Sequence, residues 1–477
     1  MALPEGIADI LPLTPVQTGM LFHVLESKGA RGRYVAVLSC RLSGPVDPQR
    51  LRAAMQEAIL ARDAYRAGFV WEDVKQPVQA IREAVELPWT ELDWQNNEGI
   101  KEQLAALIKS EQSRQFDLKQ APLMAVTLIK LDQDKWQLVW TIHHLISDGW
   151  STSVVFRDIF ERYQNKQPET QKQARFRDYI VWLRKSAPKT DKAYWTRHLE
   201  ELTAPSLLPR HEQDIDPSTL HHHVERHLGE ELLQVVQAFA IKQSMTVNTI
   251  LAATWALVLR QMLQQNDVVF GQTTAGRPAE IPGIANAAGA FINTLPFRIK
   301  IDPDQSVAAF LAQAAETQQA RASHEFASLA EVNACAPIPK GVALFDTLFV
   351  NEGIAAQKLD AGDIQLSDLS TTQSSNYALA LLATPHNAFK VEVYADPEKL
   401  DTYQATHCLD TYEKTLRAVI EGLDVPVSEL SWQDTPAISV PLAKPYAPVL
   451  ERIMPVSYTH LRAHETYLLI SYAVFCL

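Results

Sequence analysis

Two adjacent histidines, His143 and His144, are followed at short spacing by Asp148 and Gly149. An imidazole has an unperturbed pKa of about 6.5, so either ring can accept or donate a proton near neutral pH. The carboxylate of Asp148 can brace the loop, and Gly149 permits a tight backbone bend. The pattern HHxxxDG therefore predicts a site for proton-transfer chemistry.

The residues around this pattern predict how it is positioned. The apolar runs MAVTLIKL (124–131) and WQLVWTIH (136–143), joined by the polar residues 132–135, indicate a buried β-hairpin. Because successive strand residues point to opposite faces, we expect one histidine to face the interior and the other a cleft. Ser151 is the expected cap of the helix that follows.

The rest of the chain indicates a mixture of helices and strands. In the first half, residues 34–43 alternate like a strand, and Asp47 followed by Pro48 predicts a helix start. In the second half, the patterns predict helices at 229–243, 247–263 and 401–421, and strands at 267–274, 344–350, 377–383 and 389–395. The polar stretch 183–195 is the predicted crossover between two lobes.

Composition excludes several classes of protein. The 477 residues exceed the size of one compact core, so two globular units are expected. A formal charge of -12 without basic clusters argues against nucleic-acid binding. The chain shows neither a signal peptide nor an apolar run long enough to cross a membrane, so we expect a cytoplasmic protein.

Two further groups of potential ligands carry weaker signals. The four cysteines, Cys40, Cys335, Cys408 and Cys476, are far apart and lack zinc-ligand spacing, so free thiols and no metal are expected. The three consecutive histidines at 221–223 carry no fixed partner spacing, and no function is assigned to them.

Beyond HHxxxDG, a series of motifs resembles the condensation domains of nonribosomal peptide synthetases. In chain order they are LTPVQTGMLFH (13–23), YRAGFVWE (65–72), FRDYIVW (176–182), GQTTAGRP (271–278), GAFINTLPFR (289–298), SHEFASL (323–329) and LFDTLFV (344–350). The resemblance covers about residues 8–432 and keeps the family's motif order. It implies an α/β fold (α+β sandwich) of two chloramphenicol-acetyltransferase-like lobes arranged as a V-shaped pseudodimer.

The resemblance also implies roles for individual residues. His144 corresponds to the family's catalytic residue, while His143 and Asp148 correspond to structural ones, with Asp148 paired to a basic group. Gly149 is expected to place a backbone N–H near the reacting centre. For contacts with substrate, the resemblance points to Trp150, Asn293 and Arg277.

One position departs from the family pattern. Where the family commonly has an Arg-His pair, this chain has Ala61-Arg62. If the missing arginine normally pairs with the equivalent of Asp148, Arg62 must substitute from the neighbouring position, or the loop is braced less well.

The implied activity is amide bond formation between a donor acyl or peptidyl thioester and the amine of an acceptor aminoacyl thioester. Both substrates would arrive on phosphopantetheine arms of carrier proteins, with no cofactor bound by the domain itself, which is expected to be monomeric. The alternatives are an epimerization domain, a stand-alone HxxxD acyltransferase, and a non-catalytic recruitment domain of the same fold.

The expected organisation divides the chain into four parts. An N-terminal lobe spans 1–184 and a C-terminal lobe 185–433. Residues 434–454, rich in Pro and Ala, indicate a linker toward a downstream adenylation domain. The tail 455–477 matches nothing before it and is expected to be an artefact or disordered, so that its removal leaves folding and activity intact.

Overall fold

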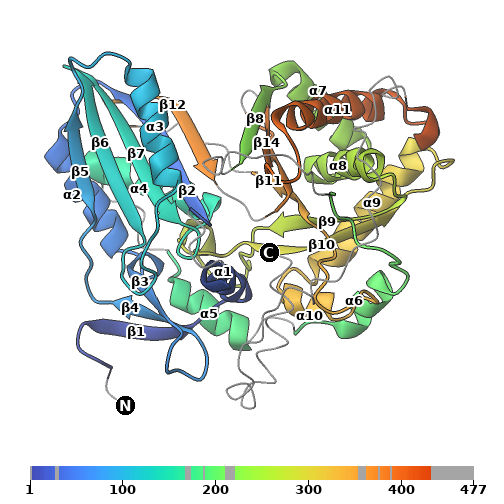
Figure 1. The fold of residues 1–477 in the computed structure, drawn as a ribbon, viewed down its shortest axis with the longest axis horizontal. Coiled ribbons are helices and arrows are strands. Elements are labelled where there is room, and N and C mark those ends of the chain that lie inside the picture. The colour runs from blue at the N-terminus through green and yellow to red at the C-terminus, as the bar shows by residue number, and fades with distance from the viewer. Residues whose placement is uncertain are drawn as a thin grey trace. The chain divides into compact units, whose positions relative to one another are not determined.

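The computed structural model describes residues 3–26, 32–166, 173–185, 189–209, 221–352, 361–373, 377–386 and 389–430. The chain divides into two compact units, shown in Figure 1. Unit 1 contains Met1–Ala187, Ala275–Ile292 and Ala356–Ser374. Unit 2 contains Pro188–Thr274, Asn293–Ala355 and Ser375–Leu477.

The division differs from two continuous lobes. The expected boundary after residue 184 lies close to the end of the first segment of unit 1 at Ala187. Two later segments, Ala275–Ile292 and Ala356–Ser374, nevertheless pack with unit 1. Local patterns could not show this, because both segments are joined to unit 1 by contacts between residues far apart in the sequence.

Unit 1 contains two sheets. The five-stranded sheet has the order β12-β2-β7-β6-β5, and the three-stranded sheet has the order β1-β4-β3. The strands are β1 (Ile7–Pro12), β2 (Val35–Ser43), β3 (Ala67–Val70), β4 (Val78–Arg82), β5 (Trp89–Asp93), β6 (Met124–Asp132), β7 (Lys135–His143) and β12 (Gln365–Gln373). The helices are α1 (Pro15–Glu26), α2 (Pro48–Leu60), α3 (Ile100–Gln112), α4 (Gly149–Tyr163) and α5 (Phe176–Lys185), with short 3₁₀ turns at Ala64–Arg66 and Ile284–Asn286.

Local sequence explains the first helix after β2 and the central hairpin. Asp47 caps α2, because its carboxylate accepts hydrogen bonds from the N–H groups of Gln49 and Arg50, and Pro48 occupies the first helical position. Strands β6 and β7 pair in antiparallel register, as the two apolar runs predicted. Their connection is tighter than expected, since both strands extend into the polar segment 132–135.

Unit 2 is built on one six-stranded sheet with the order β10-β9-β11-β13-β14-β8. Its strands are β8 (His222–His227), β9 (Asp267–Thr274), β10 (Asn293–Lys300), β11 (Thr347–Asn351), β13 (Leu379–Thr384) and β14 (Lys390–Ala395). Its helices are α6 (Lys192–Leu199), α7 (Glu230–Lys242), α8 (Val247–Leu263), α9 (Val307–Ala322), α10 (Leu329–Asn333) and α11 (Thr402–Glu421), with a 3₁₀ turn at Val427–Glu429.

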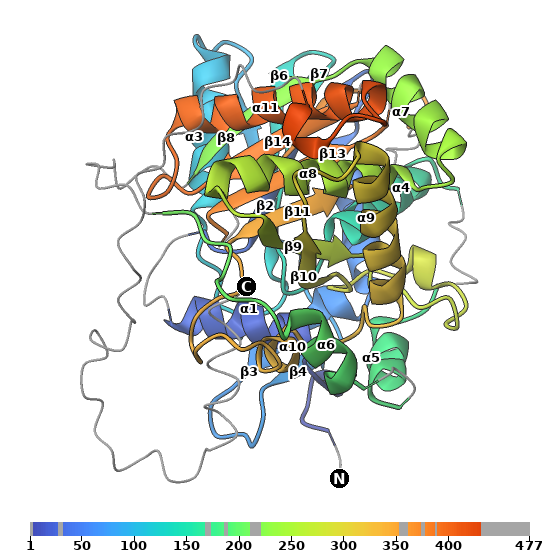
Figure 2. The ribbon, with the colours of Figure 1, turned by 90° about the vertical axis from the view of Figure 1, so that its right-hand side faces the viewer.

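The core of unit 2 lies between this sheet and its helices. Figure 2 shows α8 and α11 running across the strands, and α8 is almost completely buried. Alternate sheet residues such as Phe270, Phe349 and Val393 join the same apolar cluster. Burial of this size is the main favourable contribution to folding.

The predicted helices at 229–243, 247–263 and 401–421 are confirmed as α7, α8 and α11. One local prediction was wrong. Asp148, not Ser151, caps α4, because the carboxylate of Asp148 accepts the N–H of Ser151. The predicted crossover stretch 183–195 contains the boundary between the units at Ala187 and Pro188, and α5 ends and α6 begins within it.

The proposed linker 434–454 and the tail 455–477 lie outside the described residues. Within the described part of the chain, no helix has the length and apolar character needed to cross a bilayer.

Candidate active site

The HHxxxDG segment lies at the end of a central strand of unit 1. β7 is paired with β2 on one side and with β6 on the other, so its position is fixed along its whole length. The turn Leu145–Ser147 then leads to α4. Because the buried strand ends here and a helix begins, the last side chains of the strand lie at the edge of the core.

His143 faces the interior, as alternation along the strand predicted. Its side chain is buried against the rings of Tyr34 and Phe116. Burial, with a smaller contribution from His144, lowers its pKa to about 3. The Nδ1 atom accepts the N–H of Leu145 at 3.1 Å, so His143 is a neutral ring that holds the turn.

His144 lies on the partly exposed side of the turn. Its Nδ1 atom is 3.3 Å from the carbonyl oxygen of Ser147. Because a carbonyl only accepts, Nδ1 carries the proton and the lone pair lies on Nε2. Burial lowers the pKa of His144, and the hydrogen bond to Ser147, the charge of Asp148 and a side-chain hydrogen bond with Gln373 oppose that shift. Burial thus favours the neutral form of the ring.

Asp148 is buried and fully used in holding the loop. Its Oδ1 atom accepts the N–H of Ser151 at 2.7 Å, and its Oδ2 atom accepts the N–H of Phe291 at 3.0 Å. Oδ1 also lies 3.4 Å from Nη2 of Arg277. The expectation that Asp148 pairs with a basic group is thus met by the geometry, and the partner is Arg277.

The side chain of Arg277 is buried among protein groups. Its guanidinium donates to the carbonyl oxygens of Ile284 and Ala287 at 2.6 and 2.9 Å, and to the hydroxyl of Ser151 at 2.8 Å. Its side chain is 4% exposed. Arg277 thus ties segment 275–292 to the HHxxxDG loop, and its predicted contact with substrate stays a prediction.

Arg62 does not substitute at Asp148. Its Nη1 atom is 2.5 Å from Oδ2 of Asp158, and both side chains are buried. That pair joins the end of α2 to α4, so the loss of the family's arginine at Ala61 leaves Asp148 braced by Arg277.

Further side chains hold the turn from outside the motif. Gln17, in the predicted opening motif, donates from Nε2 to the carbonyl oxygen of Leu145 at 2.8 Å. The hydroxyl of Ser147 lies 2.8 Å from that of Tyr65 and 3.1 Å from that of Thr152. None of these side chains is distinguished by its own sequence pattern; the motifs LTPVQTGMLFH and YRAGFVWE, which contain Gln17 and Tyr65, are the signal that points to them.

The two remaining predictions near the loop have different outcomes. Gly149 is the first residue of α4, where a helix presents free N–H groups. Trp150 is half-buried and donates from Nε1 to the carbonyl oxygen of Ala285 at 2.8 Å. Its predicted contact with substrate stays a prediction.

Asn293 belongs to unit 2 and is fully bonded there. Its Nδ2 atom donates to the carbonyl oxygens of Glu325 and Ala327 at 2.9 and 2.8 Å, and its Oδ1 atom accepts the N–H of Thr294 at 3.0 Å. Asn293 thus holds the segment SHEFASL in place, and its predicted contact with substrate stays a prediction.

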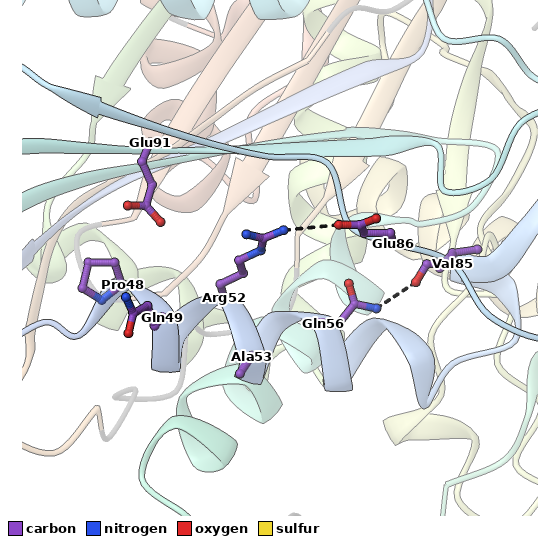
Figure 3. Close-up of a pocket in the computed structure, with 8 residues that line it drawn as sticks. All are labelled: Pro48, Gln49, Arg52, Ala53, Gln56, Val85, Glu86 and Glu91. Carbon is purple, nitrogen blue, oxygen red and sulfur yellow. Dashed lines mark hydrogen bonds and ion pairs between the residues drawn. The ribbon is translucent and has the colours of Figure 1, made fainter.

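A surface pocket of about 770 Å³ lies elsewhere in unit 1, between α2 and the strand β5 (Figure 3). Its charged side chains are satisfied locally: Arg52 pairs with Glu86 at 3.3 Å. None of the predicted site residues lines it. The pocket offers no group suited to the predicted chemistry.

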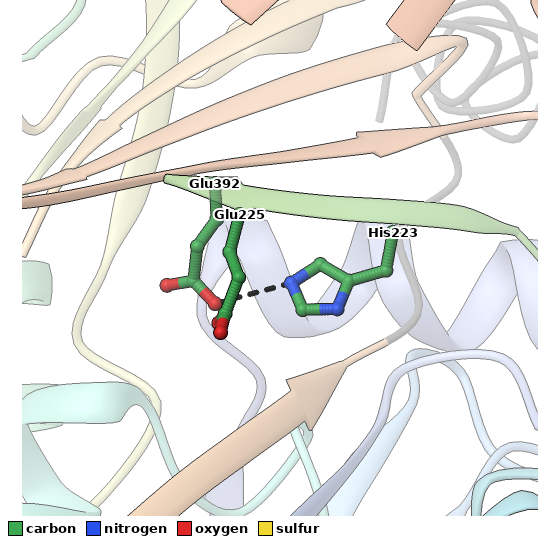
Figure 4. A group of neighbouring side chains, drawn as sticks. All are labelled: His223, Glu225 and Glu392. Carbon is green, nitrogen blue, oxygen red and sulfur yellow. Dashed lines mark hydrogen bonds and ion pairs between the residues drawn. The ribbon is translucent and has the colours of Figure 1, made fainter. Parts of the chain in front are cut away.

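The fold of unit 2 brings together three potential metal ligands that the sequence separates. His223, Glu225 and Glu392 lie on the paired strands β8 and β14, with their ligand atoms within 4.8 Å of one another (Figure 4). Lys390 already pairs with both carboxylates, at 2.9 Å from Glu392 and 3.9 Å from Glu225. The group is an ion-pair network at a sheet edge.

Comparison with known proteins identifies the family. The family model "Condensation domain" matches residues 7–435. This chain belongs to the condensation-domain family. A linear gramicidin synthase of Brevibacillus parabrevis is 31% identical to it over 441 residues, which is 89% of this chain and 6% of that protein. Gramicidin S synthase 2 of Brevibacillus brevis is 27% identical over 86% of this chain and 9% of that protein. The domain therefore spans less than a tenth of these relatives.

Solved structures show that the fold is that of condensation domains. The condensation domain of the monacolin K polyketide synthase matches 89% of this chain and 100% of its own, with a TM-score of 0.74 at 16% identity. The first condensation domain of the calcium-dependent antibiotic synthetase gives the same TM-score, 0.74, at 15% identity, over 89% of this chain and 99% of its own. The expected α/β fold of a nonribosomal peptide synthetase condensation domain is confirmed.

Proposed function

We propose that this domain joins a donor acyl or peptidyl thioester to the amine of an acceptor aminoacyl thioester, with both substrates carried on phosphopantetheine arms. His144 is the central residue of the proposal. The supporting observation is the contact of its Nδ1 atom with the carbonyl oxygen of Ser147, which favours the tautomer whose lone pair lies on Nε2.

The chemistry demands little of His144 as a base. An α-amine has a pKa of about 7.7–8.0, so roughly a tenth is already neutral at pH 7. Deprotonating the rest costs about 1.4 kcal/mol per pH unit, which is small beside a catalytic barrier. His144 therefore acts chiefly by accepting a hydrogen bond from the amine and orienting it toward the thioester carbon.

The proposed reaction forms one bond and breaks another. The amine nitrogen forms a bond with the thioester carbonyl carbon, and the carbon–sulfur bond then breaks. The thiol of the donor arm leaves, and the proton lost by the amine is passed to the thiolate through Nε2 of His144 or through water. The free N–H groups at the start of α4, beginning at Gly149, are suited to stabilise negative charge on the oxygen.

Carrier dependence separates this function from its alternatives. Tethering raises local substrate concentration to about the mM range, so a carrier-bound acceptor should react far faster than the same free aminoacyl compound at equal total concentration. The assay mixes the chain with loaded donor carrier and either acceptor form, and follows dipeptidyl product by mass spectrometry.

Each alternative gives its own result. Equal rates with free and carrier-bound acceptor would overturn the proposal and support a stand-alone acyltransferase. Inversion of the α-carbon without a new amide bond would support an epimerization domain. Binding of loaded carriers without any product would support a recruitment domain.

A further inference from the structure

The hydroxyl of Ser147 joins the HHxxxDG turn to the interior of unit 1. It lies 2.8 Å from the hydroxyl of Tyr65 and 3.1 Å from that of Thr152, in the first turn of α4. The hydroxyl of Thr152 in turn donates to the carbonyl oxygen of Asp148 at 3.0 Å. The side chains of Tyr65 and Ser147 are almost completely buried. Three hydroxyls thus form a chain of hydrogen bonds, and the proposed reaction uses none of them directly.

The direction of these bonds follows from the number of protons available. Each hydroxyl carries one proton and can accept two hydrogen bonds. Among the described residues Ser147 is the partner of the Tyr65 hydroxyl, so Tyr65 either donates to Ser147 or leaves a buried proton without an acceptor. Burial raises the pKa of Tyr65 well above its usual range, which keeps that proton on the phenol. Tyr65 therefore donates to Ser147, and Ser147 can donate to Thr152 or to the carbonyl oxygen of Asp148, 3.3 Å away.

The peptide group between Ser147 and Asp148 depends on side chains for its orientation. Within the part of the chain that the structure describes, the N–H groups of these two residues form no hydrogen bond with a backbone carbonyl. The carboxylate of Asp148 anchors one side of the peptide group, and the hydroxyl of Ser147, held by Tyr65, anchors the other. Rotation of the peptide group would break these bonds, so they fix the direction of its carbonyl oxygen.

That carbonyl oxygen, which belongs to Ser147, is the group that orients His144. It lies 3.3 Å from Nδ1 of the imidazole, a contact that favours the proton on Nδ1 and the lone pair on Nε2. The distance is at the long end of the range for a hydrogen bond, so a small rotation of the peptide group would lose the contact. The tautomer of His144 therefore depends on the chain of hydroxyls that begins at Tyr65.

We propose that Tyr65 is a positioning residue for His144: its hydroxyl holds Ser147 so that the carbonyl oxygen of Ser147 keeps the proton of the imidazole on Nδ1. No contact with substrate is assigned to Tyr65, whose side chain is fully buried. The catalytic consequence rests on the proposed function, because it requires Nε2 of His144 to meet the amine. The effect on the tautomer does not rest on it.

The first experiment reads the tautomer of His144 by NMR in ¹⁵N-histidine-labelled protein without substrate, at about pH 8, where an ordinary imidazole is neutral. The ring resonances of His144 are assigned by their absence in His144→Ala, and their shifts distinguish a protonated nitrogen from an unprotonated one. Tyr65→Phe, which removes one hydroxyl and keeps the ring, should move part of the population to the tautomer protonated on Nε2. An unchanged tautomer in Tyr65→Phe would overturn the inference.

Tyr163→Phe is the matched control for this measurement. Tyr163 is the last residue of α4, and its buried hydroxyl accepts the N–H of Asp47 at 2.9 Å. The variant therefore removes a buried hydroxyl from unit 1 at the far end of the same helix. The resonances of His144 should be unchanged in it.

The second experiment tests whether Tyr65 acts through Ser147. Tyr65→Phe and Ser147→Ala should each lower kcat for transfer to a carrier-bound acceptor by about 10-fold with little change in KM, because a misplaced reacting group reduces the rate rather than binding. The double variant should be no slower than the slower single variant, since residues that act as a unit are not additive. Fully additive losses, or wild-type kcat in Tyr65→Phe, would contradict the proposed role of Tyr65.

Stability measurements separate positioning from loss of packing. Ser147→Ala leaves the buried proton of Tyr65 without an acceptor, whereas Tyr65→Phe removes that proton, so the midpoint of chemical denaturation should fall further in Ser147→Ala. Adding Tyr65→Phe to Ser147→Ala should restore part of the loss. Tyr163→Phe should also lower the midpoint and yet keep wild-type kcat. An equal loss of kcat in Tyr163→Phe and Tyr65→Phe would show that packing alone explains the effect and would sink the inference.

The inference and the proposed function fail on different results. If His144→Ala kept full activity while Tyr65→Phe changed the tautomer, the proposed function would fail and the positioning of His144 by Tyr65 would stand. If His144→Ala were inactive while Tyr65→Phe matched the wild type in both tautomer and kcat, the inference would fail and the proposed function would stand.

Discussion

Two strands of this protein carry neighbouring histidines, in very different surroundings. β7 of unit 1 is an inner strand that ends in His143 and leads into His144, whereas β8 of unit 2 is an edge strand that begins with His222 and His223. His143 is buried and bonded to its own turn, while His223 is exposed and pairs with Glu392 at 3.2 Å. Adjacent histidines are the same sequence signal in both places, so the difference lies in what fixes them.

What fixes the first pair is a set of bonds to backbone groups. The turn after β7 is held by Gln17, Asp148 and the carbonyl oxygen of Ser147. The second pair is held by side chains of other residues at a sheet edge. Backbone groups move little, so they can orient a ring for catalysis. The ring of His223 is instead held by the buried carboxylate of Glu392, which Lys390 also binds.

The largest expected effect tests the first pair directly. His144→Ala should reduce transfer of a donor acyl group to an acceptor aminoacyl carrier by about 10²–10⁴-fold, the usual scale of acid–base and oxyanion contributions. The fold should survive, because the ring is only partly buried, and circular dichroism can confirm it. Near-normal turnover would remove His144 from the mechanism and leave proximity alone.

The next effect concerns the bracing of the loop. Asp148→Ala leaves Arg277 buried without its partner and removes the cap of α4, so the free energy of unfolding should fall by about 3–5 kcal/mol. Chemical denaturation measures it. Asp148→Asn, which keeps the cap acceptor but not the charge, should lose less. If Asp148→Ala unfolds like the wild type yet is inactive, Asp148 has a chemical role.

The smallest effect is expected at the second pair. His223→Ala removes one partner of Glu392, but Lys390 still lies 2.9 Å from that carboxylate. The free energy of unfolding should change by about 1 kcal/mol or less, and the transfer rate should not change. His222→Ala, on the other face of β8, is the matched control. A large loss of transfer activity in His223→Ala, but not in His222→Ala, would show that the histidines of β8 also contribute to the reaction.

Local sequence determined much of the catalytic region. The two apolar runs 124–131 and 136–143, with the polar residues 132–135 between them, predicted the hairpin. Asp47 followed by Pro48 predicted the start of α2. The spacing of HHxxxDG predicted a loop at the end of a strand. These features depend on residues within a few positions of one another, so the period of apolar residues and the chemistry of caps are sufficient to encode them.

Tertiary structure decided which distant groups complete the loop. The partner of Asp148 is Arg277, more than a hundred residues away, and not Arg62, which pairs with Asp158. The hydroxyl of Ser147 likewise meets that of Tyr65, 82 residues away. Such contacts depend on sheet order and register, and a shift of one residue turns every side chain to the other face. Local patterns in the sequence do not record sheet order or register, so the bonds of Arg277 and Asn293 to distant backbone carbonyls could not be predicted from them.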